Sequence, residues 1–109
     1  MMNESEAVVA LAALAQPARL RVFRALVGAG PEGMTPGALA VLLDVPSSTL
    51  SFHLKELMHA GLVSVERESR NLHYRPALDR MNDLLGFLTD HCCQGQSCGT
   101  GPARRTTTC

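Results

Sequence analysis

The fold of this chain is decided by the stretch Pro46-Ser47-Ser48-Thr49-Leu50-Ser51-Phe52-His53-Leu54-Lys55-Glu56-Leu57-Met58-His59-Ala60-Gly61-Leu62-Val63. Its apolar residues recur at helical spacing and predict a helix with one face in a core, formed by Leu50, Leu54, Leu57 and Met58. We expect Ser47 or Ser48 to cap the start of this helix. Gly61 is expected to end it in left-handed backbone, with Leu62 folding back onto the last turn.

The other face of this helix is polar and carries little bulk. It presents Ser47, Ser48, Thr49, Ser51, His53 and Lys55. A helix in the major groove of DNA needs such side chains, because base edges and phosphates are contacted by hydrogen bonds. We interpret His53 as a phosphate contact and His59 as complementing the helix dipole. The alternative is an ordinary surface helix with a solvated face.

A hairpin pattern follows directly. Val63 and Val65, then Leu72 and Tyr74, alternate with polar residues, and this spacing is typical of strands. A helix, a turn, a helix and a basic hairpin together predict a winged helix-turn-helix. The wing residues expected to reach DNA are Arg67, Arg70, Asn71, His73 and Arg75, with Arg70 and Arg75 as the strongest candidates.

The flanking segments predict further helices. One covers Asn3–Ala15, with Asn3 and Glu6 as a capping box, and is apolar nearly all round, so a second subunit is its expected cover. Another helix is expected over Ala18–Ala29, with Pro17 at its start. Its core-facing residues are expected to be Leu20, Phe23, Leu26 and Val27. Its solvent-facing residues are expected to be Arg19, Arg21 and Arg24.

The third helix is expected to start at Thr35-Pro36 and to end at Leu43, with Leu39, Leu42 and Leu43 inward. The last helix is expected from Asp79 to about His91, with Met81, Leu84, Leu85 and Leu88 on one face. The fold class is therefore mainly α (α+β), with about five helices and a two-stranded wing, and we expect a dimer.

Length and charge limit the function. A chain of 109 residues forms one domain, with ten acidic and ten basic residues and no formal net charge. DNA-binding domains are usually basic, so the neutral balance favours a rival hypothesis, a winged helix that binds proteins and has no operator. Salt-dependent binding of duplex DNA separates the two. The sequence shows no glycine-rich phosphate loop and no paired carboxylates typical of an enzyme.

The N-terminus is acidic and unlike a signal peptide, and no apolar run has transmembrane length. We therefore expect a cytoplasmic protein with no membrane partner. All four cysteines lie within the last eighteen residues. In a reducing compartment they indicate metal or redox chemistry rather than disulfides. We expect residues 1–93 to form the DNA-binding and dimerisation domain and residues 94–109 a flexible tail.

Four segments resemble the ArsR family of bacterial metalloregulatory repressors, and more narrowly its arsenic-responsive members. They are Gln16-Pro17-Ala18-Arg19-Leu20-Arg21, Leu50-Ser51-Phe52-His53-Leu54-Lys55-Glu56-Leu57, Ala60-Gly61-Leu62-Val63 and Arg70-Asn71-Leu72-His73-Tyr74-Arg75. The resemblance covers roughly residues 5–91. It implies a homodimer, joined through the first and last helices, that binds its own operator and leaves when metal binds.

The chain departs from one branch of that family. Thr35 and Gly37 stand where many arsenic repressors carry a Cys-x-Cys pair. Zinc-sensing relatives use Asp/His pairs on the last helix, and Asp79, Asp83, Asp90 and His91 do not form a full set. The sequence resembles the branch whose inducer site is C-terminal.

Trivalent arsenic favours three thiolates, and Cys92, Cys93 and Cys98 offer three within seven residues. Cys92 continues the apolar stripe of the last helix, so arsenite or antimonite bound there would reshape the dimer seam. Zinc on His91 and the same cysteines fits less well, because adjacent cysteines are poor zinc spacing. A redox switch and incidental tail thiols remain open. Cys109 is the expected bystander.

Overall fold

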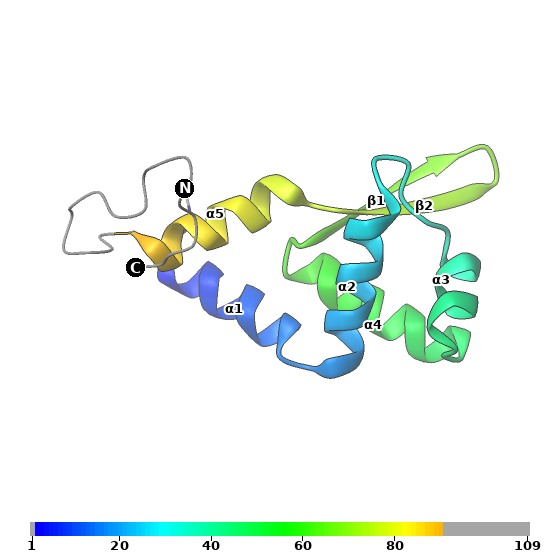
Figure 1. Cartoon of the computed structure of the whole chain (residues 1–109), viewed down its shortest axis with the longest axis horizontal. Coiled ribbons are helices and arrows are strands. Elements are labelled where there is room, and N and C mark those ends of the chain that lie inside the picture. Colours follow the sequence, from blue (N-terminus) through cyan, green and yellow to red (C-terminus); the bar gives the residue numbers. More distant parts are fainter. Residues whose placement is uncertain (1, 91–109) are drawn as a thin grey trace.

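The computed structural model describes residues 2–90 of the chain. Within them the elements follow the order α1 (Glu4–Leu14), α2 (Pro17–Ala29), α3 (Pro36–Leu43), α4 (Ser47–His59), β1 (Val63–Glu68), β2 (Asn71–Pro76) and α5 (Leu78–Thr89). Helices α1 and α5 lie together at one end, α3 and the β1–β2 hairpin lie at the other, and α2 and α4 stand between them (Figure 1). The expected five helices and two-stranded wing are confirmed.

Local sequence signals fix the ends of several helices. The Asn3 side chain accepts a hydrogen bond from the Glu6 N–H at 2.8 Å, and the Glu6 carboxylate accepts one from the Asn3 N–H at 3.0 Å. The expected capping box of α1 is therefore confirmed. At the start of α3 the Thr35 hydroxyl accepts from the Ala38 N–H at 3.2 Å.

Helix α4 begins differently from the expectation. The N-cap position belongs to Pro46, and neither serine hydroxyl makes a capping hydrogen bond. The expected serine cap was wrong: α4 starts one residue earlier than expected, so Pro46, which has no side-chain acceptor, takes the N-cap position and Ser47 is the first helical residue. The helix ends as expected, with Gly61 at φ +79° and the Leu62 N–H donating to the Leu57 carbonyl at 3.0 Å.

The core lies beneath α4. The largest fully buried side chains are Val22, Leu26, Leu39, Leu50, Leu57 and Leu62. Leu50, Leu54 and Leu57 confirm the expected inner face of α4, but Met58 is 38% exposed and does not belong to it. Position 58 follows Leu57 by about 100° around the helix, which turns its side chain toward the hairpin.

In two other helices the expected core residues are confirmed only in part. In α2 the core takes Val22 with Phe23 and Leu26, and it leaves Leu20 and Val27 nearly half exposed. The α2 sequence has more apolar positions than one face can hold, so spacing predicted Phe23 and Leu26 correctly but not Leu20 and Val27. In α3 Leu39 is buried and Leu43 packs against the core as expected, but Leu42 faces solvent.

Among the described residues no single helix is long and apolar enough to cross a membrane. Taken together, α3 and α4 have the length and apolar composition of such a segment, but they are bent by 113° where they meet.

The wing is fixed to the rest of the domain at its base. The strands pair antiparallel from Val63↔Pro76 to Glu68↔Asn71. Met34, in the loop before α3, exchanges backbone hydrogen bonds with Tyr74 of β2, at 3.0 and 2.8 Å. Gly33 has φ +75°, and a Cβ there would collide with the Tyr74 carbonyl oxygen. Glycine is therefore required where the loop meets the strand.

Candidate nucleic-acid interface

The polar face of α4 is accessible over its first two turns. Ser47, Ser48, Thr49, Ser51 and Lys55 are all exposed. Their side chains make no hydrogen bond or ion pair to any of residues 2–90. The opposite face is anchored against α1, α2 and α3. A rigid helix therefore presents four free hydroxyls and one ammonium group to solvent.

His53 lies on the buried side of this helix, contrary to the sequence interpretation. Its side chain is 6% exposed, and its Nδ1 atom is buried without a partner among the described residues. The residue follows Leu50 by three positions and precedes Leu57 by four, which places it with the leucines. The polar side chain of His53 predicted a position on the DNA-facing surface, whereas its spacing from Leu50 and Leu57 places it on the core side of the helix.

Burial lowers the pKa of His53 below its ordinary value of about 6.5, and the nearby charge of Arg19 lowers it further. The unfolded chain therefore binds a proton at a higher pH than the folded chain does. We expect the stability contributed by neutral His53 to be complete above pH 6.5 and to be lost as the pH falls through the lower folded pKa.

Urea unfolding of wild type and His53→Leu between pH 7.5 and 5, from about 1 unit above to about 1.5 units below the ordinary histidine pKa, tests this expectation. The difference in unfolding free energy between the two proteins should change with pH. The matched control is His59→Gln, because His59 is exposed on the same helix. A difference that stays constant over the whole range would refute the role given to His53.

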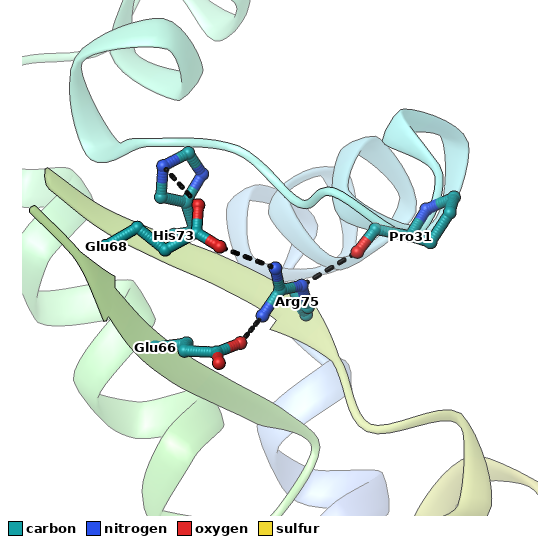
Figure 2. Close-up of polar contacts among 5 residues, drawn as sticks. All are labelled: Pro31, Glu66, Glu68, His73 and Arg75. Carbon is teal, nitrogen blue, oxygen red and sulfur yellow. Dashed lines mark hydrogen bonds and ion pairs between the residues drawn. The ribbon is translucent and has the colours of Figure 1, made fainter.

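Arg75 is engaged within the protein rather than free to bind DNA. Its Nε donates to the Pro31 carbonyl at 2.7 Å, and its guanidinium pairs with Glu66 and, at 3.9 Å, with Glu68 (Figure 2). Glu68 also lies 3.6 Å from His73 Nε2. Arg75 thus joins the wing to the α2–α3 loop, and the expectation of a solvent-facing wing cation was wrong at this position.

The strand register separates the charges of the wing onto two faces. Because Glu66 pairs with His73, these two residues share one face with Glu68, Asn71 and Arg75. Arg67 projects from the opposite face, together with Tyr74. Tyr74 lines a groove of about 470 Å³ between the wing and α4, whose other walls are Ser51, Phe52, Lys55 and Met58. Arg67 therefore shares the hairpin face that bounds this groove, away from the carboxylates.

The neutral net charge conceals a positive edge. Three arginines are paired within the described residues: Arg19 with Glu56 at 3.7 Å, Arg80 with Glu6 at 3.8 Å, and Arg75 with its two glutamates. Five cationic side chains form no ion pair within residues 2–90: Lys55, Arg67, Arg70, Arg21 and Arg24. The first three lie on α4 or the wing, Arg21 and Arg24 lie on α2, and exposed Asp79 and Asp83 lie on α5. Most of the unpaired positive charge is therefore on the two elements that form the hydroxyl face and the wing.

Two residues of this surface were missed by the sequence analysis. Arg19, expected to be solvated, is 16% exposed, and its Cζ atom lies 5.9 Å from the centre of the Phe52 ring. Phe52 itself is exposed among the polar residues of α4. The spacing of Phe52 could have predicted its position on the polar face, because it follows Ser48 by four residues and precedes Lys55 by three.

The expected inducer residues Cys92, Cys93 and Cys98 lie outside the described residues, as do His91 and Cys109. Over residues 2–90, no group of three or more His, Cys, Asp or Glu side chains is placed to hold a metal ion.

Comparisons with known proteins agree with this geometry. A family model described as a helix-turn-helix domain matches residues 14–66. The nodulation protein NolR of Rhizobium meliloti is 38% identical over 80 residues, which span 73% of this chain but only 63% of that protein. The HTH-type transcriptional regulator CmtR of Mycobacterium tuberculosis is 33% identical over 111 residues, spanning 94% of this chain and 91% of CmtR.

Solved structures show the same fold. An ArsR-like transcriptional regulator from Rhodococcus superposes with a TM-score of 0.70 at 26% identity, covering 77% of this chain and 76% of that one. A homodimeric winged helix-turn-helix DNA-binding domain from Mycobacterium bovis, a possible ArsR-family regulator, superposes with a TM-score of 0.62 at 26% identity, covering 86% and 87%.

An accessible polar helix beside a basic wing, in a fold shared with these proteins, defines a DNA-binding transcriptional regulator of the winged-helix type. CmtR and the Rhodococcus protein are both described as transcriptional regulators. Within that class, the chain belongs to the ArsR family.

Proposed function

We propose that this chain is a homodimeric repressor that binds a two-fold-related operator and is released by trivalent arsenic or antimonite on Cys92, Cys93 and Cys98. The observation that supports DNA binding is that the free hydroxyls of α4 lie on the same two elements, α4 and the wing, as the unpaired side chains of Lys55, Arg67 and Arg70. The proposed release by arsenic rests on the sequence alone, namely the three cysteines Cys92, Cys93 and Cys98.

Each α4 would enter a major groove with its first turns. Ser47, Ser48, Thr49 and Ser51 would contact base edges and sugar–phosphate oxygens, and Lys55 would neutralise a phosphate. Arg67 and Arg70, with Asn71 near the tip of the wing, would extend the contact to the flanking backbone. Because phosphate contacts dominate such affinities, binding should weaken steeply with added salt.

The dimer would form through α1 and α5. These helices lie side by side at the end of the molecule away from the wing (Figure 1). They expose Val8, Val9, Leu11, Leu85 and Leu88, whose large apolar side chains would otherwise face water. An apolar patch of this kind marks an interaction surface. The homodimeric structure from Mycobacterium bovis supports this assembly.

Inducer binding would act on the same end of the molecule. Helix α5 ends at Thr89, three residues before Cys92. Convergence of three thiolates on one ion would reshape the chain next to the dimer helix, and so change the spacing of the two α4 helices. A coupling free energy of about 1–3 kcal/mol is typical of such linkage and would change operator affinity about 5- to 150-fold.

The experiment is fluorescence anisotropy of a promoter duplex from upstream of the protein's own gene, titrated with reduced protein and then with arsenite. We expect arsenite to release wild type and Cys109→Ser from DNA, and to leave Cys92→Ser bound. Binding that arsenite does not affect would refute the arsenic assignment and direct the search to other soft metals or oxidants. Failure to bind duplex DNA at low salt would instead favour a protein-interaction module.

A further inference from the structure

An aromatic side chain stands in the middle of the polar face of α4. Phe52 is the sixth residue of the helix and is 55% exposed. Ser48 lies one turn before it and Lys55 one turn after it on the same face, opposite buried Leu50 and Leu57. The Phe52 ring is not part of the hydrophobic core, to which α4 contributes Leu50, Leu54 and Leu57.

The ring of Phe52 is nevertheless held in place. The guanidinium carbon of Arg19 lies 5.9 Å from its centre, within the range of a cation–π contact. Arg19 is itself fixed by Glu56 at 3.7 Å. The centre of the buried His53 ring lies 5.7 Å from that of Phe52, at an interplanar angle of 59°. An exposed ring supported in this way loses little conformational freedom when it makes a contact.

We propose that Phe52 is a specificity-determining residue that contacts the 5-methyl group of a thymine in each half-site. This inference rests on the proposed operator binding. Thymine carries the one apolar group among the base edges of the major groove, and an apolar side chain such as phenylalanine is its natural contact. The first turns of a recognition helix are the part that contacts base edges, and Phe52 lies in its second turn.

The expected effect follows from the size of one methyl group. Removing a methyl from water contributes a factor of about four in affinity. A dimer that makes the same contact in both half-sites should therefore lose about 15-fold when both methyl groups are absent. Replacing thymine with deoxyuridine removes the methyl and leaves every hydrogen-bonding group of the base pair unchanged.

The test uses the full-length reduced protein and a duplex selected by that protein from a random library. Thymines are replaced by deoxyuridine one symmetric pair at a time, and affinity is measured by anisotropy. We expect one pair to weaken wild type about 15-fold. Phe52→Ala should bind the thymine duplex more weakly and bind the two duplexes equally. A thymine preference that persists in Phe52→Ala, or the lack of any such pair, would overturn the inference.

The matched control is Met58→Ala, because Met58 is an exposed apolar residue on the same helix, beyond its first turns. It should keep the thymine preference. Loss of the preference in both variants would show a general change in α4 and would also overturn the specific role of Phe52. If wild type selects no duplex at all, the proposed repressor function fails; selection without methyl dependence refutes this inference alone.

Discussion

Replacing both Leu85 and Leu88 with glutamate is expected to give a folded monomer that binds operator DNA at least about 100-fold more weakly than wild type. Both side chains are 52% exposed on α5, so the single chain does not need them for its own core. Their buried neighbour Leu84 remains to hold α5 against the domain. The fold should therefore survive while the dimer does not.

The size of this effect comes from the loss of linked binding. A dimer that has placed one α4 in DNA holds the second near its half-site, and that high effective concentration multiplies the affinity by about 10²–10⁴. Two glutamates per protomer would have to be desolvated in the apolar α1–α5 surface, which opposes association. A monomer retains one set of contacts only.

Sedimentation velocity gives the oligomeric state, and anisotropy on the same samples gives operator affinity. Val27→Glu is the matched control, since Val27 is similarly exposed but lies on α2, outside the proposed dimer surface. The control should stay dimeric and bind DNA. A doubly substituted protein that still sediments as a dimer would contradict the assignment of α5 to the interface.

The second large effect is expected in the core. Leu57→Ala should lower the free energy of unfolding by about 3–5 kcal/mol. Leu57 is fully buried on the inner face of α4, and its carbonyl accepts the hydrogen bond that the Leu62 N–H donates just beyond the end of the helix. A domain of this size has about 5–15 kcal/mol of total stability, so such a loss leaves little margin. Operator binding should fail together with folding.

Met58→Ala, one residue further along, should cost less than about 1 kcal/mol. The two residues are neighbours in sequence and similar in volume, but Met58 faces the groove beside Tyr74 rather than the core. Urea unfolding followed by circular dichroism measures both changes. Equal losses in the two variants would mean that α4 is rotated from the orientation described above.

The charge distribution shows why net charge is a poor guide to this surface. The chain is neutral, yet Arg75 and Arg80 are occupied by carboxylates, whereas Lys55, Arg67 and Arg70 are free within the described residues. Coulomb interactions at a DNA surface depend on the charges within about 8–10 Å rather than on the sum over the chain. The neutral balance therefore does not oppose the DNA-binding assignment.

Local patterns in the sequence predicted most of the fold. The capping box at Asn3 and Glu6, the left-handed Gly61 and the alternation in the hairpin were all confirmed, because each depends on residues within a few positions of one another. The hydroxyl face of α4 follows from helical spacing in the same way. The C-terminal thiols and the flexible tail remain predictions.

Tertiary structure decided which of several possible faces meets the core. Val22 rather than Leu20 is buried in α2, and His53 is buried in α4, because the neighbouring helices select one side of each. Arg75 bonds to Pro31, 44 residues away in sequence, so no local pattern predicts that pair. The sequence alone determined the elements and their order, whereas packing between distant segments determined which side chains are left free to contact DNA.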